Sequence, residues 1–124
     1  MNTDNRPNYP ENIIDLNQII SNIGSESVAL DILKMFINSI PQNKRELLTA
    51  YHAMDIQDLR ELCHKFKGST AYCIMPNLED SLNRLHSLII KDPENHAAIQ
   101  DSCQKVLEAF DKVNETYHQL DIEN

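Results

Sequence analysis

Apolar residues recur at intervals of three and four along most of this chain, which is the spacing of one face of an α-helix. In "IIDLNQIISNI" (13–23) they stand at positions 13, 16, 19, 20 and 23 and stop before Gly24. Glycine adopts the left-handed conformation that commonly ends a helix, so Gly24 predicts a C-terminal cap. No segment shows a strand pattern, and the sequence therefore predicts an all-α fold.

The next segment predicts one long helix that continues through Pro41. Ser25 or Ser27 can cap its start. Its inward-facing side chains are expected to be Val28, Ile32, Met35, Phe36 and Ile40 before the proline, and Leu47, Leu48, Tyr51 and Met54 after it. Two helices that meet at Pro41 would fit the same pattern. Because 41–44 contains no glycine and no real loop, we favour a single helix with a kink at the proline.

A further helix is predicted over 55–74, with Asp55 as its N-cap. The side chains on its apolar side are Leu59, Leu62, Cys63, Phe66, Thr70 and Cys73. This helix should end near Ile74–Met75, because Pro76 follows and a residue before proline is pushed toward extended conformations.

The last two helices are predicted from two further prolines. Pro76 can occupy the first turn of a helix that runs to "KDPEN" (91–95), where Asp92 can cap and Pro93 can start the final helix. That helix is expected to reach about residue 119. Its predicted inward side chains are Ile99, Val106, Leu107, Phe110, Val113 and Tyr117.

Four long helices with short connections predict an antiparallel four-helix bundle over 12–120, and the short helix of 13–23 should cover one end. Residues 1–11 contain two prolines and no apolar periodicity, which predicts a flexible leader or linker. Residues 121–124 are expected to form a C-terminal tail.

The net charge of −8 argues against nucleic acid and anionic membrane surfaces as partners, because both attract basic proteins. No apolar run approaches the roughly 20 residues that span a bilayer. The first residues lack the basic start and apolar stretch of a signal peptide. We therefore expect a cytoplasmic domain without membrane contact, in which Cys63, Cys73 and Cys103 are reduced, buried thiols and not metal ligands.

His64, Lys67, Gly68 and Ala71 are spaced i, i+3, i+4 and i+7, so they form one stripe of their helix. The apolar side chains lie mostly elsewhere, which predicts that His64 is at least partly exposed. Glycine inside a helix costs about 1 kcal/mol relative to alanine. A neutral imidazole is nucleophilic near pH 7, and with a lysine and a missing side chain beside it the stripe suits a phosphoryl group.

The spacing by itself favours a simpler interpretation. In that interpretation His64 is an ordinary surface histidine, Gly68 is a contact between crossing helices, and the neighbouring basic residues Arg60, Lys65 and Lys67 are solvated.

The stretch "HKFKGSTAYCIMPNL" resembles the signature of histidine-containing phosphotransfer (HPt) domains, broadly H-x-L-K-G-S-x-x-x-x-G-x-x-x-L. His64, Lys67, Gly68, Ser69 and Leu78 match in place, while Phe66 replaces a leucine. The resemblance extends over roughly residues 13 to 90. The pattern "Y-C-x-x-P-x-L" (72–78) is similar to the HPt module at the end of tripartite hybrid sensor kinases of the BarA type.

This resemblance implies a monomeric phosphocarrier and not an enzyme with a substrate pocket. It implies that His64 accepts a phosphoryl group from the aspartate of one response-regulator receiver domain and passes it to another. Lys67 would offset the phosphate charge, and Gly68 would keep the approach open. The partners would be receiver domains and a hybrid sensor histidine kinase. The receiver would supply magnesium, so no cofactor of the domain itself is expected.

Two positions depart from the family pattern. Ile74 stands where a glycine often turns the chain, and a β-branched residue resists positive φ, so the turn must be made another way, through Met75–Pro76. His86 stands where the family commonly has Glu or Gln, which fixes the inner ring nitrogen of the phosphorylated histidine. Our hypothesis is that neutral His86 orients His64 and that transfer weakens as His86 is protonated. The alternative, that His86 faces solvent, stays open.

Three further expectations concern the same face. Ser69 should bond back to the helix backbone. Ala71 and Met75 are candidate docking residues near His64. The principal functional alternative is a helical adaptor that binds a receiver or kinase through this face without taking phosphate, and a metal-binding bundle is a third possibility.

Overall fold

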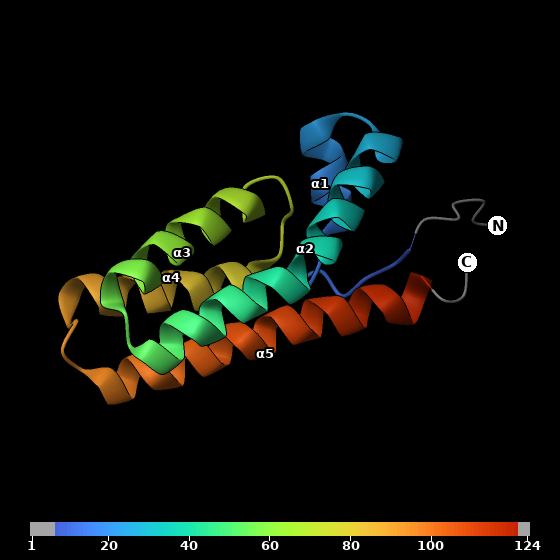
Figure 1. The fold of residues 1–124 in the computed structure, drawn as a ribbon. Helices are drawn as coiled ribbons and strands as arrows, with labels where there is room; N and C mark the ends of the chain where they lie inside the picture. The colour runs from blue at the N-terminus through green and yellow to red at the C-terminus, as the bar shows by residue number, and fades with distance from the viewer. Residues whose placement is uncertain (1–6, 122–124) are drawn as a thin grey trace.

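The computed structural model describes residues 7–121, of which the side chains are described to residue 119. The described chain forms five helices (Figure 1): α1 (Leu16–Ile23), α2 (Glu26–Ala53), α3 (Ile56–Thr70), α4 (Pro76–Lys91) and α5 (His96–Asp121). Helices α2 to α5 form an antiparallel bundle in which α2 and α4 each pack against both α3 and α5. The predicted all-α bundle is therefore confirmed.

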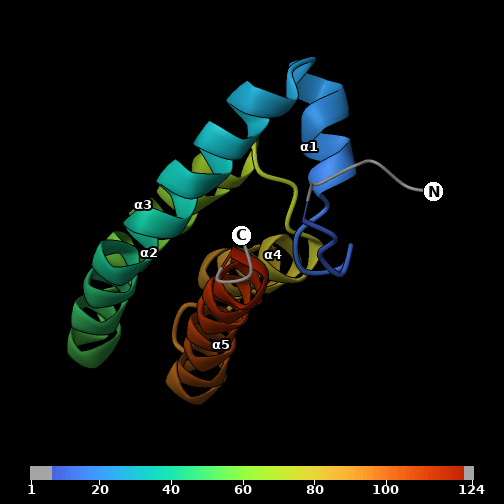
Figure 2. The ribbon, with the colours of Figure 1, turned by 90° about the vertical axis from the view of Figure 1, so that its right-hand side faces the viewer.

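Helix α1 packs against α2, and Figure 2 shows it beside the first turns of α2, away from α5. Asp15 caps α1 through its side chain, and Gly24 ends it with a φ of 83°, as predicted. The helix starts at Leu16 and not at residue 13, because the amides of Ile13 and Ile14 bond to the carbonyl of Pro10 in a preceding turn.

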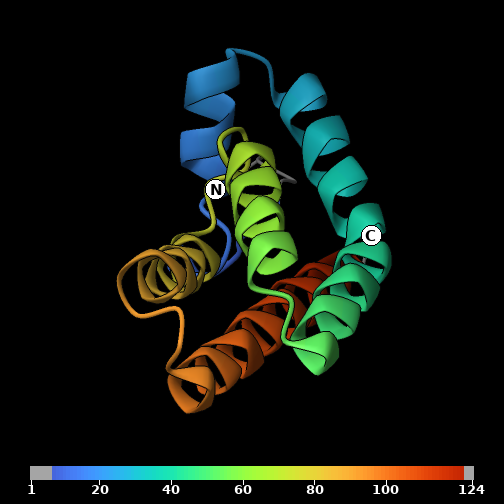
Figure 3. The ribbon, with the colours of Figure 1, turned by 60° about the vertical axis from the view of Figure 1, so that its left-hand side comes forward.

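Helix α2 runs without interruption through Pro41, and Figures 1 and 3 show that it changes direction along its length. The prediction of one helix is confirmed, but its buried face differs from the predicted one. Val28 and Met35 are 46 % and 70 % exposed. The buried stripe of the first half contains Phe36 and Ile40, as predicted, but its other members are Ala29, Leu33 and Ile37. Ala29 belongs to this stripe because it stands four residues before Leu33.

Three phenylalanines tie the bundle together across its core. The ring of Phe110 on α5 lies 6.5 Å from the ring of Phe36 on α2 and 5.3 Å, edge-on, from the ring of Phe66 on α3. Such geometries add a favourable term to the burial of large apolar surfaces. The core therefore fixes α3 firmly, and with it the side chains on the opposite face of α3.

The segment before α1 packs on the bundle. Tyr9, within the predicted leader, is buried and stacks on Tyr117 at 6.3 Å between ring centroids. The packed part of the chain therefore begins earlier than we expected. Residues 1–6 of the predicted leader, and 122–124 of the predicted tail, lie outside the described residues.

Helix α3 ends at Thr70, several residues before the predicted end near Ile74–Met75. Residues 71–75 make the connection to α4, and Ile74 does so without positive φ. The carbonyl of Ile74 accepts a hydrogen bond of 2.8 Å from the amide of Asp15, which braces the connection. Met75 is 0 % exposed and therefore cannot dock a partner, whereas Ala71 is exposed.

Pro76 occupies the first turn of α4, as predicted. Helix α5 begins at His96, three residues after the predicted start at Pro93. The side chain of Asn95 caps it by accepting a hydrogen bond from the amide of Ala98, and Asn95 also donates to the carboxylate of Asp92. Asn95 supplies the capping oxygen that we had assigned to Asp92.

Candidate functional site

The two sides of α3 differ sharply in exposure. Leu62, Cys63 and Phe66 are buried in the core, whereas His64 and Gly68 are exposed and Lys67 is half-buried. The predicted exposure of His64 is confirmed. Because the core face of α3 is anchored by Phe66, His64 projects from a rigid support.

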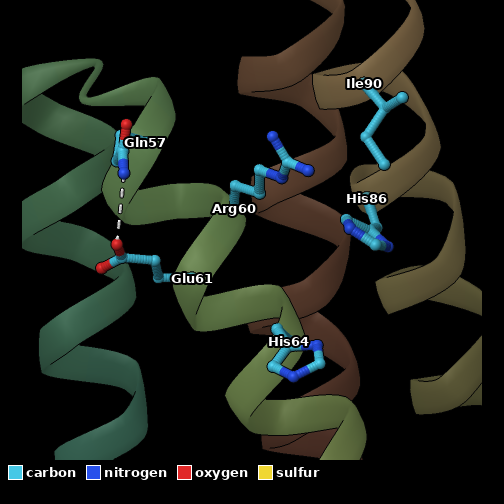
Figure 4. A pocket seen from close by; sticks show the side chains of 6 residues that line it. All are labelled: Gln57, Arg60, Glu61, His64, His86 and Ile90. Carbon is cyan, nitrogen blue, oxygen red and sulfur yellow. Dashed lines mark hydrogen bonds between the residues drawn. The ribbon is translucent and has the colours of Figure 1, made fainter.

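His64 and His86 line one shallow depression between α3 and α4, with a volume of about 450 Å³ (Figure 4). Figure 4 shows the side chains of Arg60 and His86 extending from the two helices toward the space between them. The lining residues are Gln57, Arg60, Glu61, His64, His86 and Ile90. The structure thus brings together two histidines that are 22 residues apart in the sequence.

The resemblance to the HPt family led to the hypothesis that His86 orients the ring of His64 through a hydrogen bond. Among the hydrogen bonds of the described residues, the side chain of His86 is instead joined to Lys67, with 3.1 Å between His86 Nδ1 and Lys67 Nζ. The long side chain of Lys67 crosses from α3 to α4. A lysine ammonium can only donate, so Nδ1 of His86 accepts, and the ring is neutral with its hydrogen on Nε2.

The surroundings of His86 favour this neutral form. Burial lowers the pKa of His86 below its ordinary value of 6.5, and electrostatic interactions with Lys67, Arg60 and His64 lower it further. Each of these effects penalises the positive charge that protonation would place on the ring. His86 therefore remains able to accept a hydrogen bond at neutral pH.

Two cations flank His64 without a carboxylate partner. Among residues 7–119, no Asp or Glu forms an ion pair with Arg60 or with Lys67. The carboxylate of Glu61 accepts instead from Gln57 at 3.4 Å. The face around His64 therefore retains positive charge, although the chain as a whole carries −8.

Arg60 was not among the site residues that we selected from the sequence. It stands four residues before His64, and this spacing alone could have placed it on the same face. In the sequence, Arg60 is one of three neighbouring basic residues, together with Lys65 and Lys67. In the structure Lys65 lies apart from the other two, because it turns toward α2 and binds Glu46.

Gly68 is exposed, and a Cβ atom built there would meet no atom within 4 Å outside its own helix. Its φ is not positive. The interpretation of Gly68 as a contact between crossing helices is therefore wrong, since neither packing nor backbone conformation requires glycine. Beside it, the hydroxyl of Ser69 donates to the carbonyl of Lys65 at 3.3 Å, as predicted.

The three cysteines are free and buried, as predicted. Burial raises the pKa of Cys63 and Cys103 to about 12 and that of Cys73 to about 11, so all three are protonated thiols at neutral pH. Within the described part of the chain, no three His, Cys, Asp or Glu side chains are placed to hold a metal ion together. None of the described helices has both the length and the apolar character needed to cross a bilayer.

The fold and the site together define a small helical domain that presents an exposed histidine between unpaired cations. The Hpt domain family model matches residues 31–121, and the chain belongs to this family. Hpt domains are phosphocarrier modules of two-component signalling.

Two known proteins are similar to this chain. The Hpt domain of a sensor hybrid histidine kinase from Shewanella has the same fold, with a TM-score of 0.80 over 93 % of this chain and 98 % of that one, at 18 % identity. The sensor protein GacS of Pseudomonas syringae pv. syringae is 28 % identical over 79 residues. This match covers 63 % of the chain but 9 % of GacS, so the chain spans a small part of that relative's length.

Proposed function

We propose that His64 carries the phosphoryl group of a two-component phosphorelay. An unprotonated ring nitrogen of His64 attacks the phosphorus of an aspartyl phosphate in a receiver domain. The new N–P bond forms as the bond from phosphorus to the carboxylate oxygen breaks, and the receiver aspartate leaves as a carboxylate. The reverse reaction with a second receiver discharges His64. The observation that carries this proposal is the exposed His64 on a face with unpaired cations, in a chain of the Hpt family.

Lys67 and Arg60 would stabilise the charge of the phosphoryl group on His64. Neither cation is neutralised by a carboxylate among the described residues, so both can attract the transferred group. Charge-assisted hydrogen bonds to phosphate are stronger than neutral ones. Two cations on one helical face therefore give the otherwise acidic domain a local site for an anion.

Gly68 would leave room for the receiver that brings the phosphoryl group. Among the described residues, no atom outside its own helix comes within 4 Å of a Cβ placed there, and glycine weakens the helix, so the requirement for a small residue comes from outside the domain. Ala71, about one turn further along, is also small and exposed. The receiver would also supply the magnesium ion for the reaction, so the domain needs no cofactor of its own.

We propose receiver domains and a hybrid sensor histidine kinase as partners of a monomeric domain. The family membership supports receiver partners, and the similarity to GacS, named a sensor protein, supports the kinase. Phosphoryl-transfer assays with each candidate receiver test which one donates to the domain and which one accepts from it.

The test is phosphoryl transfer from a phosphorylated receiver to the purified domain. We expect an acid-labile, base-stable label on the wild type and none on His64→Gln. His96→Gln, which changes an exposed histidine at the start of α5, is the matched control and should label as the wild type does. A domain that binds the receiver but takes no label would establish the adaptor function instead.

A further inference from the structure

The contact between Lys67 and His86 has a consequence for the reaction at His64. Lys67 would otherwise be a flexible side chain, and fixing it at the phosphoryl group would cost conformational entropy. The 3.1 Å contact between Lys67 Nζ and His86 Nδ1 already holds it between α3 and α4. An ammonium has three N–H groups, so a bond to His86 leaves two for phosphoryl oxygens.

We propose that His86 is a positioning residue that acts through Lys67, holding its ammonium beside His64, and that protonation of His86 releases this hold. The inference rests on the proposed phosphotransfer at His64. It differs from our sequence-based hypothesis, in which His86 acts directly on the ring of His64.

The charges around His86 determine the pH at which it is protonated and releases Lys67. The cationic or titratable groups that face it from α3 are Arg60, His64 and Lys67, and Glu61 of α3 lines the same depression. From α5, which packs on α4 as well, none of the described groups contributes to the shift of its pKa. A protonated His86 would have only donors to present to a lysine that also only donates, so the contact would become repulsive.

A double-mutant cycle separates action through Lys67 from action on His64. We would compare initial transfer rates from a phosphorylated receiver for wild type, His86→Ala, Lys67→Ala and the double variant at pH 8. We expect His86→Ala to slow transfer about 3- to 10-fold alone and less than about 2-fold in the Lys67→Ala background, since residues that act as a unit are non-additive. An equal loss in both backgrounds would overturn the inference.

His86→Gln is the conservative variant for this cycle. Its amide oxygen can accept from Lys67 at any pH, so it should restore most of the rate that His86→Ala loses. The ratio of the wild-type rate to the His86→Gln rate should fall as pH decreases from 8 to 5.5, because only the wild type loses its acceptor. The pH dependence of the receiver affects both rates alike, and a ratio that stays constant would contradict the proposal.

The controls distinguish this inference from the proposed function. If the wild type takes no label on His64, phosphotransfer itself fails. If the label forms but the two substitutions slow transfer independently, only the role of His86 fails. Thermal melting of each variant shows that the bundle remains folded. The ¹⁵N shifts of the His86 ring give a structural readout, since the Nε2–H tautomer should predominate in the wild type and less so in Lys67→Ala.

Discussion

Lys65 and Lys67 stand two residues apart on α3 and meet very different partners. Lys65 points toward α2 and pairs with the carboxylate of Glu46 at 2.8 Å, so its charge is offset. Lys67 points toward α4 and meets the neutral ring of His86, which orients the ammonium and leaves its charge intact. An anion that approaches His64 therefore encounters Lys67 as an available cation, whereas Lys65 is already paired.

One side of α3 packs into the core, and another side presents ionisable groups to solvent. The core side of α3 is filled by large apolar groups such as Phe66. On the side toward α4, Arg60 and His64 line a shallow depression, and Lys67 contacts His86. Substitutions on these sides should therefore affect different measurements.

The sharpest contrast is between Phe66→Ala and His64→Gln. Truncating a buried phenylalanine costs about 3–5 kcal/mol, so Phe66→Ala should strongly lower the free energy of unfolding measured in urea. His64→Gln lies on the exposed surface and should change it by less than about 0.5 kcal/mol while abolishing the label. A large loss of stability in His64→Gln would show that the two sides of α3 are not independent.

Lys65→Ala and Lys67→Ala test the comparison between the two lysines directly. A hydrogen bond to a charged group contributes about 1.5–3 kcal/mol, so Lys67→Ala should slow transfer about 10- to 100-fold. Lys65→Ala should stay within about 2-fold of the wild type, because its charge is offset by Glu46 and an exposed pair of this kind contributes little. Rates of phosphoryl transfer at saturating receiver measure both, and equal losses would refute the distinction.

Gly68→Ala and Gly68→Gln separate the needs of the helix from those of the partner. Gly68→Ala should raise the free energy of unfolding by about 1 kcal/mol, because alanine favours the helix and the added Cβ meets no neighbour. Gly68→Gln should remain folded while transfer falls steeply, since its side chain enters the space left for the receiver. Circular dichroism and the transfer assay provide the two readouts, and unfolding of Gly68→Gln would indicate a packing role.

The smallest predicted effects are changes of stability with pH, and Glu46 and His86 should produce them in different pH ranges. The hydrogen bond from Lys65 lowers the pKa of Glu46 below its ordinary 4.5, so its stabilising contribution is present above that value and is lost as pH falls through the lowered pKa. The pKa of His86 is lowered from 6.5, so the unfolded chain takes up its proton first and stability declines as pH falls below that value.

Melting temperatures of Glu46→Gln and His86→Gln, each compared with the wild type between pH 8 and 3.5, measure these contributions. The melting temperature of the wild type should fall relative to that of His86→Gln at the higher pH, and relative to that of Glu46→Gln at the lower pH. Coincident losses would mean that one common unfolding event, and not the two separate groups, produces the pH dependence.

Much of the fold was predictable because it depends on local spacing. Helical periodicity, Gly24 and the first-turn position of Pro76 are signals carried by neighbouring residues, and the structure confirms each of them. The predicted ends were less accurate. The sequence could not show that α3 stops at Thr70, because the connection that follows is held at Ile74 by the amide of Asp15, which is distant in the sequence.

Some features of the candidate site also follow from local spacing, whereas others depend on distant parts of the chain. The exposure of His64 and the stripe it forms with Lys67 and Gly68 follow from positions on a single helix, and the family motif lies in that stretch. The partner of each cation depends on side chains from other helices. The periodicity of α3 says nothing about whether Glu46 or His86 lies within reach of a given lysine.

The amino-acid sequence thus establishes which residues share a helix face, because a helix has a fixed rise and rotation per residue. The packing of the helices adds three contacts: Lys65 pairs with Glu46 of α2, Lys67 contacts His86 of α4, and Arg60 lies with His64 at the same depression. These contacts depend on how α2 and α4 pack around α3. Packing sets the relative rotation and level of the helices, which no single segment encodes.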